Sequence, residues 1–201
     1  MTLDLDAQGT VSTDSLDPEL VAQVEALFKT ARKHMAKRRW DEALATYEEI
    51  IALQREAGDD LGVARTQNDI ASLYLAQREW QQALELLEQV LPVLQEAEAD
   101  DDVAIALNNL AAAHYELGDA ARGLEIYEEA LQLRRDQGNA IGEAKTLRNI
   151  GVFYGKRGDV HRAKSYLNRA LVVAKQANSK ELVRAIRQSL SQVGRRGKKR
   201  R

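Results

Sequence analysis

The sequence predicts an all-α solenoid in which pairs of antiparallel helices repeat along the chain. Apolar residues recur at a period near 3.6 and nowhere alternate at period 2 over a useful length, which indicates helices and not strands. A shift of 40 residues superposes the sequence on itself over about four copies, which indicates stacked structural repeats. Two prolines among 201 residues and a charged fraction of 30% favour long helices with wet outer faces.

The 40-residue period is carried by residues that pack helices together. It aligns Trp40 with Trp80 and places a small residue at one phase of every copy, namely Ala43, Ala83, Gly123 and Ala163. Two antiparallel helices approach to about 8 to 10 Å only where side chains are short. The small residues are therefore predicted to mark the helix crossing within each repeat.

Turn residues and caps divide the chain. We expect repeats at about 21–58, 61–98, 101–138 and 141–178, with breaks at Gly58, Gly118, Gly138 and Gly158, at the polar pair 78–79 and at the acidic run 100–102. Residues 181–193 form one more amphipathic helix, which is expected to cap the solenoid of residues 17–193. The aperiodic residues 1–16 read as a disordered acidic arm, and 194–201 as a disordered basic tail.

Helical periodicity also predicts the core. The inward positions are occupied by apolar or aromatic side chains and one histidine: Ile70, Tyr74, Ala83, Leu84, Leu107, Leu110, His114, Leu124, Tyr127, Ile150 and Tyr154.

Several functional classes are disfavoured. The chain has no cysteine, which excludes thiolate catalysis and thiolate metal sites, and its acidic start does not resemble a signal peptide. No apolar run is long enough to cross a bilayer. His34 and His114 fall on packed helix faces, and His161 has no second ligand nearby in the sequence pattern. We expect a cytoplasmic protein that is not an enzyme and has no metal or other cofactor.

Charge is segregated along the chain. Residues 1–140 hold 28 acids and 12 bases, a net charge of −16, whereas 141–201 hold 3 acids and 17 bases, a net charge of +14. Such a basic field attracts polyanions. The expected polyanion contacts are Arg195, Arg196, Lys198, Lys199, Arg200 and Arg201. The alternative is that these bases are only a solvated, solubilising end, and the tail lacks the interleaved aromatic residues that single-strand binders use.

The segment NLAAAHYELGDAARGLEIYEEAL, residues 109–131, resembles a tetratricopeptide repeat of the 40-residue type found in kinesin light chains and in bacterial regulatory solenoids. The resemblance covers about 160 of the 201 residues. It implies a right-handed superhelix of about four helix pairs, whose first helices line a concave groove that captures peptides or partner surfaces.

The groove is predicted from the residues that remain on the first helices once the packed face is assigned. They are Arg65, Asn68, Asp69, Ser72, Asn108, Asn109, Ala112, Lys145, Arg148 and Asn149. Asparagine is a mediocre helix former, yet it recurs in these helices, and its amide suits the backbone of an extended peptide. The alternative is that these asparagines only bridge neighbouring repeats.

Three functions remain open on the sequence alone. The first is an adaptor or scaffold that binds a protein or peptide segment in the groove. The second is a nucleic-acid- or ribosome-associated factor that acts through the basic repeat and tail on RNA, DNA or an acidic protein. The third is a self-assembling homo-oligomer, in which the acidic repeats of one copy meet the basic end of another.

Overall fold

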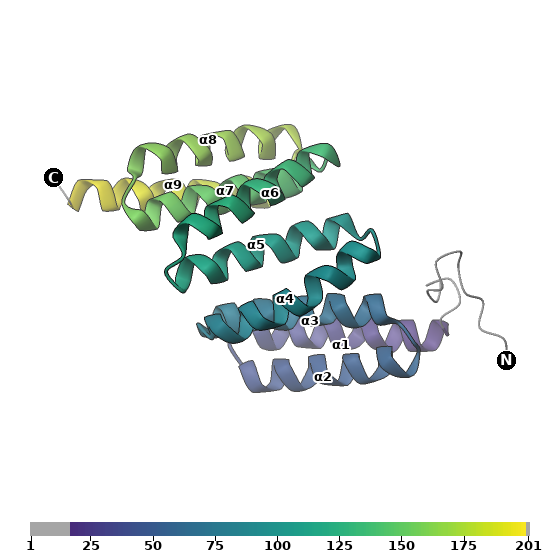
Figure 1. Cartoon of the computed structure of the whole chain (residues 1–201). Helices are drawn as coiled ribbons and strands as arrows, with labels where there is room; N and C mark the ends of the chain where they lie inside the picture. Colours follow the sequence, from purple (N-terminus) through teal and green to yellow (C-terminus); the bar gives the residue numbers. More distant parts are fainter. Residues whose placement is uncertain (1–16, 200–201) are drawn as a thin grey trace. The chain divides into compact units, whose positions relative to one another are not determined.

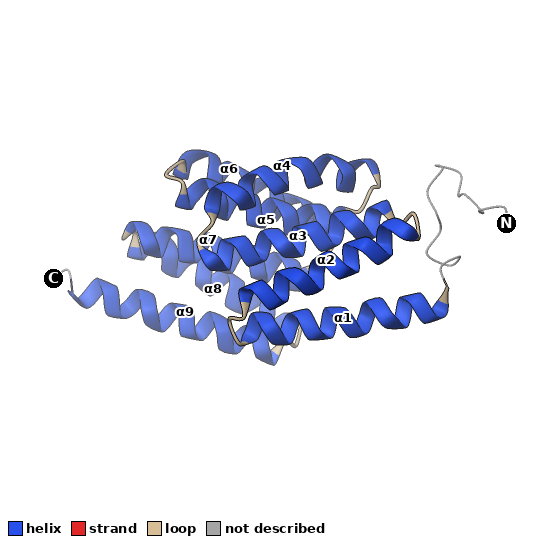
Figure 2. Ribbon diagram, turned by 90° about the horizontal axis from the view of Figure 1, so that it is seen from below, coloured by secondary structure: helices blue, strands red, loops and turns tan. Residues whose placement is uncertain are grey.

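The structure is a computed structural model that describes residues 17–199, with side chains up to residue 195. Those residues form nine helices and no strand (Figures 1 and 2). The helices are α1 (Pro18–Ala36), α2 (Trp40–Glu56), α3 (Asp60–Gln77), α4 (Trp80–Glu96), α5 (Asp100–Glu116), α6 (Ala120–Asp136), α7 (Ala140–Arg157), α8 (Val160–Gln176) and α9 (Lys180–Lys199). The predicted all-α fold of repeated helix pairs is confirmed. No helix within the described range is both long and apolar enough to cross a membrane.

One residue with a left-handed backbone lies in each connection between helices. These residues have φ between 51° and 100° and are Arg38, Gly58, Arg78, Glu98, Gly118, Gly138, Gly158 and Asn178. Four of the glycines are followed by an Asp or Asn that caps the next helix, as when Asp59 accepts a hydrogen bond of 2.7 Å from the backbone N–H of Gly62. The spacing of 20 residues between these turns sets the lengths of α2 to α8.

The structure differs from the expectation at the C-terminal end and at the acidic run 100–102. Asp17 caps α1 as expected, accepting a 2.9 Å hydrogen bond from the Glu19 N–H, but the arm of residues 1–16 lies outside the described residues. At the other end α9 continues through residues 194–199, where the sequence predicted a disordered tail. Arginine and lysine are good helix formers, so the helix extends past Gly194.

The acidic run 100–102 does not break the chain between repeats as predicted. It forms the first turn of α5, where carboxylates interact favourably with the helix dipole.

Each repeat has a small residue on its second helix where that helix packs against the first. Ala43, Ala83 and Ala163 are fully buried. In the third repeat a Cβ added to Gly123 would lie 2.7 Å from the backbone oxygen of Ala111, so only glycine fits there. The prediction that these positions face the neighbouring helix is confirmed.

Most of the predicted core is buried, but four members lie at its edge. Ile70, Ala83, Leu107, Leu110, Tyr127, Ile150 and Tyr154 are buried. Tyr74, Leu84, His114 and Leu124 are only partly buried, which corrects the prediction for these four. Leu84 and Leu124 share one phase of the repeat, directly after the buried small residue of the second helix.

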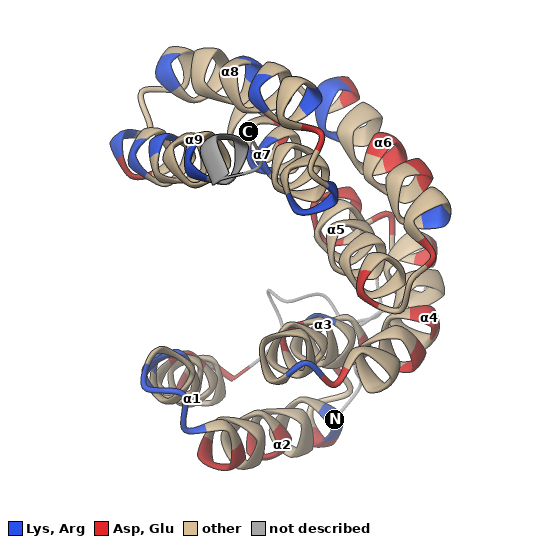
Figure 3. Ribbon diagram, turned by 90° about the vertical axis from the view of Figure 1, so that its left-hand side faces the viewer, with Lys and Arg blue, Asp and Glu red and all other residues tan. Residues whose placement is uncertain are grey.

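The chain divides into two compact units, unit 1 up to Asp102 and unit 2 from Val103 onward. Unit 1 has 22 acids and 9 bases, a net charge of −13, whereas unit 2 has 9 acids and 20 bases, a net charge of +11. Figure 3 shows Lys and Arg distributed over α7, α8 and α9, and Asp and Glu prominent on α2 and α4. The structural division therefore also separates the charges, although it lies 38 residues before the boundary at 140 seen in the sequence. Residues 103–140, which belong to unit 2, hold 6 acids and 3 bases.

Candidate functional site

The first helices of unit 2 are joined by a ladder of amides. Asn108 on α5 donates from Nδ2 to the backbone oxygen of Ala104 at 2.7 Å and to Oγ1 of Thr146 at 3.0 Å. Asn149 on α7 in turn donates from Nδ2 to Oδ1 of Asn108 at 3.2 Å. Thr146 is fully buried, so the ladder satisfies a hydroxyl in the core between the two helices. Asn108 and Asn149 therefore bridge neighbouring repeats, which is the alternative that the sequence left open.

A cleft of about 130 Å³ opens between α5 and α7, beside this ladder. Its walls are largely aromatic or apolar, and three of the predicted groove residues border it; the lining residues are Ala112, Tyr115, Glu116, Tyr127, Arg148, Asn149, Val152, Phe153 and Lys156. The rings of Tyr115 and Phe153 lie 4.9 Å apart between centroids. The cleft is thus an apolar slot on the predicted ligand face of unit 2.

Charged groups border the cleft and are already positioned by neighbours. Lys156 forms an ion pair with Glu116, and its Nζ lies 5.4 Å from the centroid of the Tyr115 ring. The Nε of Arg148 donates to Oγ of Ser189 on α9 at 3.2 Å. Burial, followed by the nearby carboxylate of Glu116, raises the pKa of Tyr127 well above its usual range, so its hydroxyl stays protonated.

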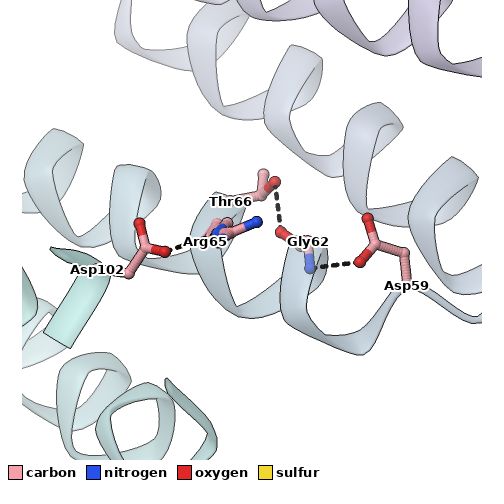
Figure 4. A network of polar contacts seen from close by, with 5 residues as sticks. All are labelled: Asp59, Gly62, Arg65, Thr66 and Asp102. Atoms are coloured by element: carbon pink, nitrogen blue, oxygen red, sulfur yellow. Dashed lines mark hydrogen bonds and ion pairs between the residues drawn. The ribbon is translucent and has the colours of Figure 1, made fainter. Parts of the chain in front are cut away.

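In unit 1 the corresponding face is polar and internally paired (Figure 4). The Nε of Arg65 lies 2.7 Å from Oδ2 of Asp102, and Thr66 donates to the backbone oxygen of Gly62 at 3.0 Å. Burial, opposed by Arg32 and reinforced by Asp102, raises the pKa of Asp69. The carboxylates on this face of unit 1 are therefore already partly neutralised by arginines of the same unit.

The predicted groove residues fall into three groups. Ala112, Arg148 and Asn149 border the cleft. Asn68 is only 4% exposed, and Ser72 donates to its backbone oxygen at 3.2 Å. Contrary to the prediction, Asn68 therefore does not face an open groove. Arg65 and Lys145 are exposed, and the remaining ones are half-buried, namely Asp69, Ser72, Asn108 and Asn109. Of the predicted polyanion contacts Arg195 is exposed on α9, and the side chains of residues 196–201 lie outside the described ones.

Sequence reasoning missed an aromatic and cationic cluster on α7 and α8. The rings of Tyr154 and Tyr166 stack with centroids 5.5 Å apart and an interplanar angle of 18°. The guanidinium carbon of Arg162 lies 5.5 Å from the Tyr154 centroid, and that of Arg169 lies 5.2 Å from the Tyr166 centroid. The available signal was the spacing of residues 162, 166 and 169, which places all three on one side of a helix.

Solved structures with similar folds cover most of the chain. A crystal structure of BtubC (BKLC) from P. vanneervenii has a TM-score of 0.67 and 22% identity, covering 90% of this chain and 77% of that one. A Podosopora anserina protein described as a kinesin light chain with nearly identical TPR-like repeats has a TM-score of 0.64 and 18% identity, covering 89% and 88%.

A Rap protein, solved in complex with competence and sporulation factor, has a TM-score of 0.71 and 16% identity, but this chain spans only 52% of its length while 86% of this chain is covered. No curated protein matches the sequence. These identities establish similarity of fold alone. The tetratricopeptide repeat model matches residues 30–96 and 102–176, more than half of the sequence. The chain therefore belongs to the tetratricopeptide repeat family.

Proposed function

We propose that this protein is a non-enzymatic adaptor that binds an extended peptide segment of a partner protein on the face formed by α5 and α7. The observation that carries the proposal is the cleft between these helices, because it is the place in unit 2 where predicted groove residues border an apolar opening. Ligand pockets combine such apolar walls with a few polar groups that fix orientation. The solved complex of a structurally similar Rap protein with competence and sporulation factor is consistent with this role.

The size of the cleft limits what it accepts. An enclosed cavity of about 150 Å³ holds one benzene ring, so an opening of about 130 Å³ takes a single apolar side chain. Tyr115, Val152 and Phe153 supply the contact surface for it. The anchoring residue is therefore expected to be leucine, methionine or phenylalanine.

Charge determines the residues expected next to that anchor. Unit 2 carries a net charge of +11, and Arg148 and Lys156 both border the cleft. Arginine binds a carboxylate through its planar fork of N–H groups. The hydrogen bond to Ser189 uses the Nε–H of Arg148, and the other four of its five N–H donors lie on the two terminal nitrogens. The preferred peptide carries an acidic residue close to its apolar anchor.

A randomised peptide library displayed to the full chain tests this proposal. The wild type is expected to enrich a motif with one apolar and one acidic residue. Val152→Asp, which places a carboxylate in the cleft, is expected to weaken binding of the selected peptide at least tenfold, about 1.4 kcal/mol. Arg148→Gln is expected to keep the apolar preference and lose the acidic one.

Val172→Asp is the matched control, since Val172 is 55% exposed on α8 and does not line the cleft. All variants are compared by thermal melting, so that lost binding is distinguished from lost folding. Failure of the wild type to enrich any motif would contradict the proposal. Equal affinities of Val152→Asp and Val172→Asp for the selected peptide would place the binding site elsewhere.

A further inference from the structure

Four planar groups lie together on α7 and α8, one of them buried and the other three accessible, and we call them the Arg–Tyr stack. They are Arg162, Tyr154, Tyr166 and Arg169. The two tyrosine rings stack on each other, and each arginine lies over one of them. Arg162, Tyr166 and Arg169 come from α8, whereas Tyr154 comes from α7.

The arginines of the stack are exposed yet held in place. The side chain of Arg162 is 65% exposed, and Arg169 is also exposed. A guanidinium resting on a ring is restrained by cation–π attraction. Arg162 also faces Asp159 through Nε and hydrogen-bonds to Tyr154, and the remaining N–H donors of its five can bind an anion. Less side-chain freedom is then lost when an anion binds.

Opposing charges near the stack are few. Asp159 lies 3.5 Å from Nε of Arg162. Burial, followed by the neighbouring Tyr166 and then by Glu128 on α6, raises the pKa of Tyr154 against the opposing charge and hydrogen bond of Arg162. Because this pKa is raised, the tyrosine hydroxyl stays neutral and does not cancel the charge of the arginines. The exposed Arg157, one helical turn after Tyr154 on α7, adds a further positive charge.

The repeat itself does not require this arrangement. Two periods earlier, in unit 1, the residues equivalent to Tyr154, Arg162, Tyr166 and Arg169 are Tyr74, Gln82, Leu86 and Gln89. There Tyr74 and Leu86 line an open cavity of about 300 Å³, and the helix pair still forms. Packing of the solenoid therefore explains the tyrosine on the first helix but not the second ring or the two arginines.

We propose that the Arg–Tyr stack is a contact site for single-stranded nucleic acid. Backbone phosphates accept hydrogen bonds from the guanidinium edges, and a base stacks on an outer guanidinium plane, which the tyrosine ring beneath it holds in place. Alternation of aromatic and cationic groups is how proteins bind single strands without sequence preference. An acidic protein would need the two charges but not the rings. The inference is independent of peptide binding in the cleft.

The test measures the affinity of the full chain for a fluorescent twelve-residue oligouridine and, separately, for heparin. Tyr166→Leu, Arg162→Gln and Arg169→Gln each install the residue of the second repeat, so each variant is expected to fold. Tyr166→Leu is expected to weaken oligouridine binding about fivefold or more while changing heparin binding less than twofold, because stacking is lost and charge is kept.

Each arginine variant is expected to weaken both ligands and to reduce the slope of log affinity against log salt for the oligouridine by about 0.7. The control Lys175→Gln removes an exposed cation from the end of α8, outside the stack, and is expected to have a smaller effect on oligouridine. Melting temperatures verify the fold of each variant.

Three results would overturn the proposal. One is a wild-type chain that does not bind oligouridine at low salt. Another is a Tyr166→Leu variant that loses heparin and oligouridine equally or neither, since the ring would then have no specific role. The last is an arginine variant that matches Lys175→Gln, which would reduce the stack to general surface charge.

Discussion

The amide ladder of unit 2 makes a quantitative prediction about stability. Asn108→Ala removes the hydrogen bonds to the Ala104 oxygen, to Thr146 and from Asn149. Thr146 is fully buried, and a buried hydroxyl that loses a partner costs about 1 to 3 kcal/mol. Alanine regains about 0.7 kcal/mol of helix propensity. We expect a net destabilisation of about 1 to 2 kcal/mol, seen as a lower urea midpoint at constant m-value.

A double-mutant cycle with Thr146→Val isolates the bond between the two side chains. Valine keeps the shape of threonine but removes the hydroxyl, so the double variant no longer leaves that group without its partner. We expect the summed destabilisation of the two single variants to exceed the destabilisation of the double variant by about 0.5 to 1.5 kcal/mol. Additivity within about 0.3 kcal/mol would show that the ladder does not stabilise the interface, and the asparagines would again be candidates for ligand binding.

Further predictions concern the turns, the helix crossing and one tyrosine. Gly118 has φ of 100°, and a Cβ added there would meet no neighbouring atom, so Gly118→Ala is expected to destabilise the protein by about 1 kcal/mol through backbone strain alone. Glu98 has φ of 51°, so Glu98→Gly is expected to stabilise the protein by about 0.5 kcal/mol. Urea titration measures both effects. Gly123→Ala is expected to destabilise by about 1 kcal/mol net, because the clash with a backbone oxygen exceeds the gain in helix propensity; an unchanged melting temperature would contradict this. Burial, with Asp69 nearby, raises the pKa of Tyr47 to about 12, so its contribution is intact below about pH 10 and is lost as pH rises toward 12; Tyr47→Phe should therefore lessen the decline of the melting temperature over that interval.

Helix positions were predictable because the same local signals recur every 20 residues. Half of the turns are marked in the sequence by a glycine, namely Gly58, Gly118, Gly138 and Gly158. The turn at Glu98 was placed two residues too late, because a glutamate with a left-handed backbone has no signature in the sequence, whereas the acidic run after it resembles a break. Only the structure shows that those acids begin α5.

The candidate site was harder to predict because one side of a first helix borders both solvent and the next helix. Asn68 and Asn108 share one phase of the repeat, and periodicity cannot tell whether an amide faces a ligand or an adjacent repeat. The structure buries Asn68 and pairs Asn108 with α7. The Arg–Tyr stack escaped prediction for another reason: Tyr154 and Tyr166 lie on different helices, and their register depends on how the helix pair packs.

An aromatic chain links the two proposed sites in unit 2. Phe153 is buried, and its centroid lies 4.9 Å from that of Tyr115 in the cleft and 5.2 Å from that of Tyr154 in the stack. A change at Phe153 would therefore disturb both sites and the core together, and could not assign a function to either. Val152 and Tyr166 each belong to one site only, which is why substitutions there separate peptide capture from nucleic-acid binding.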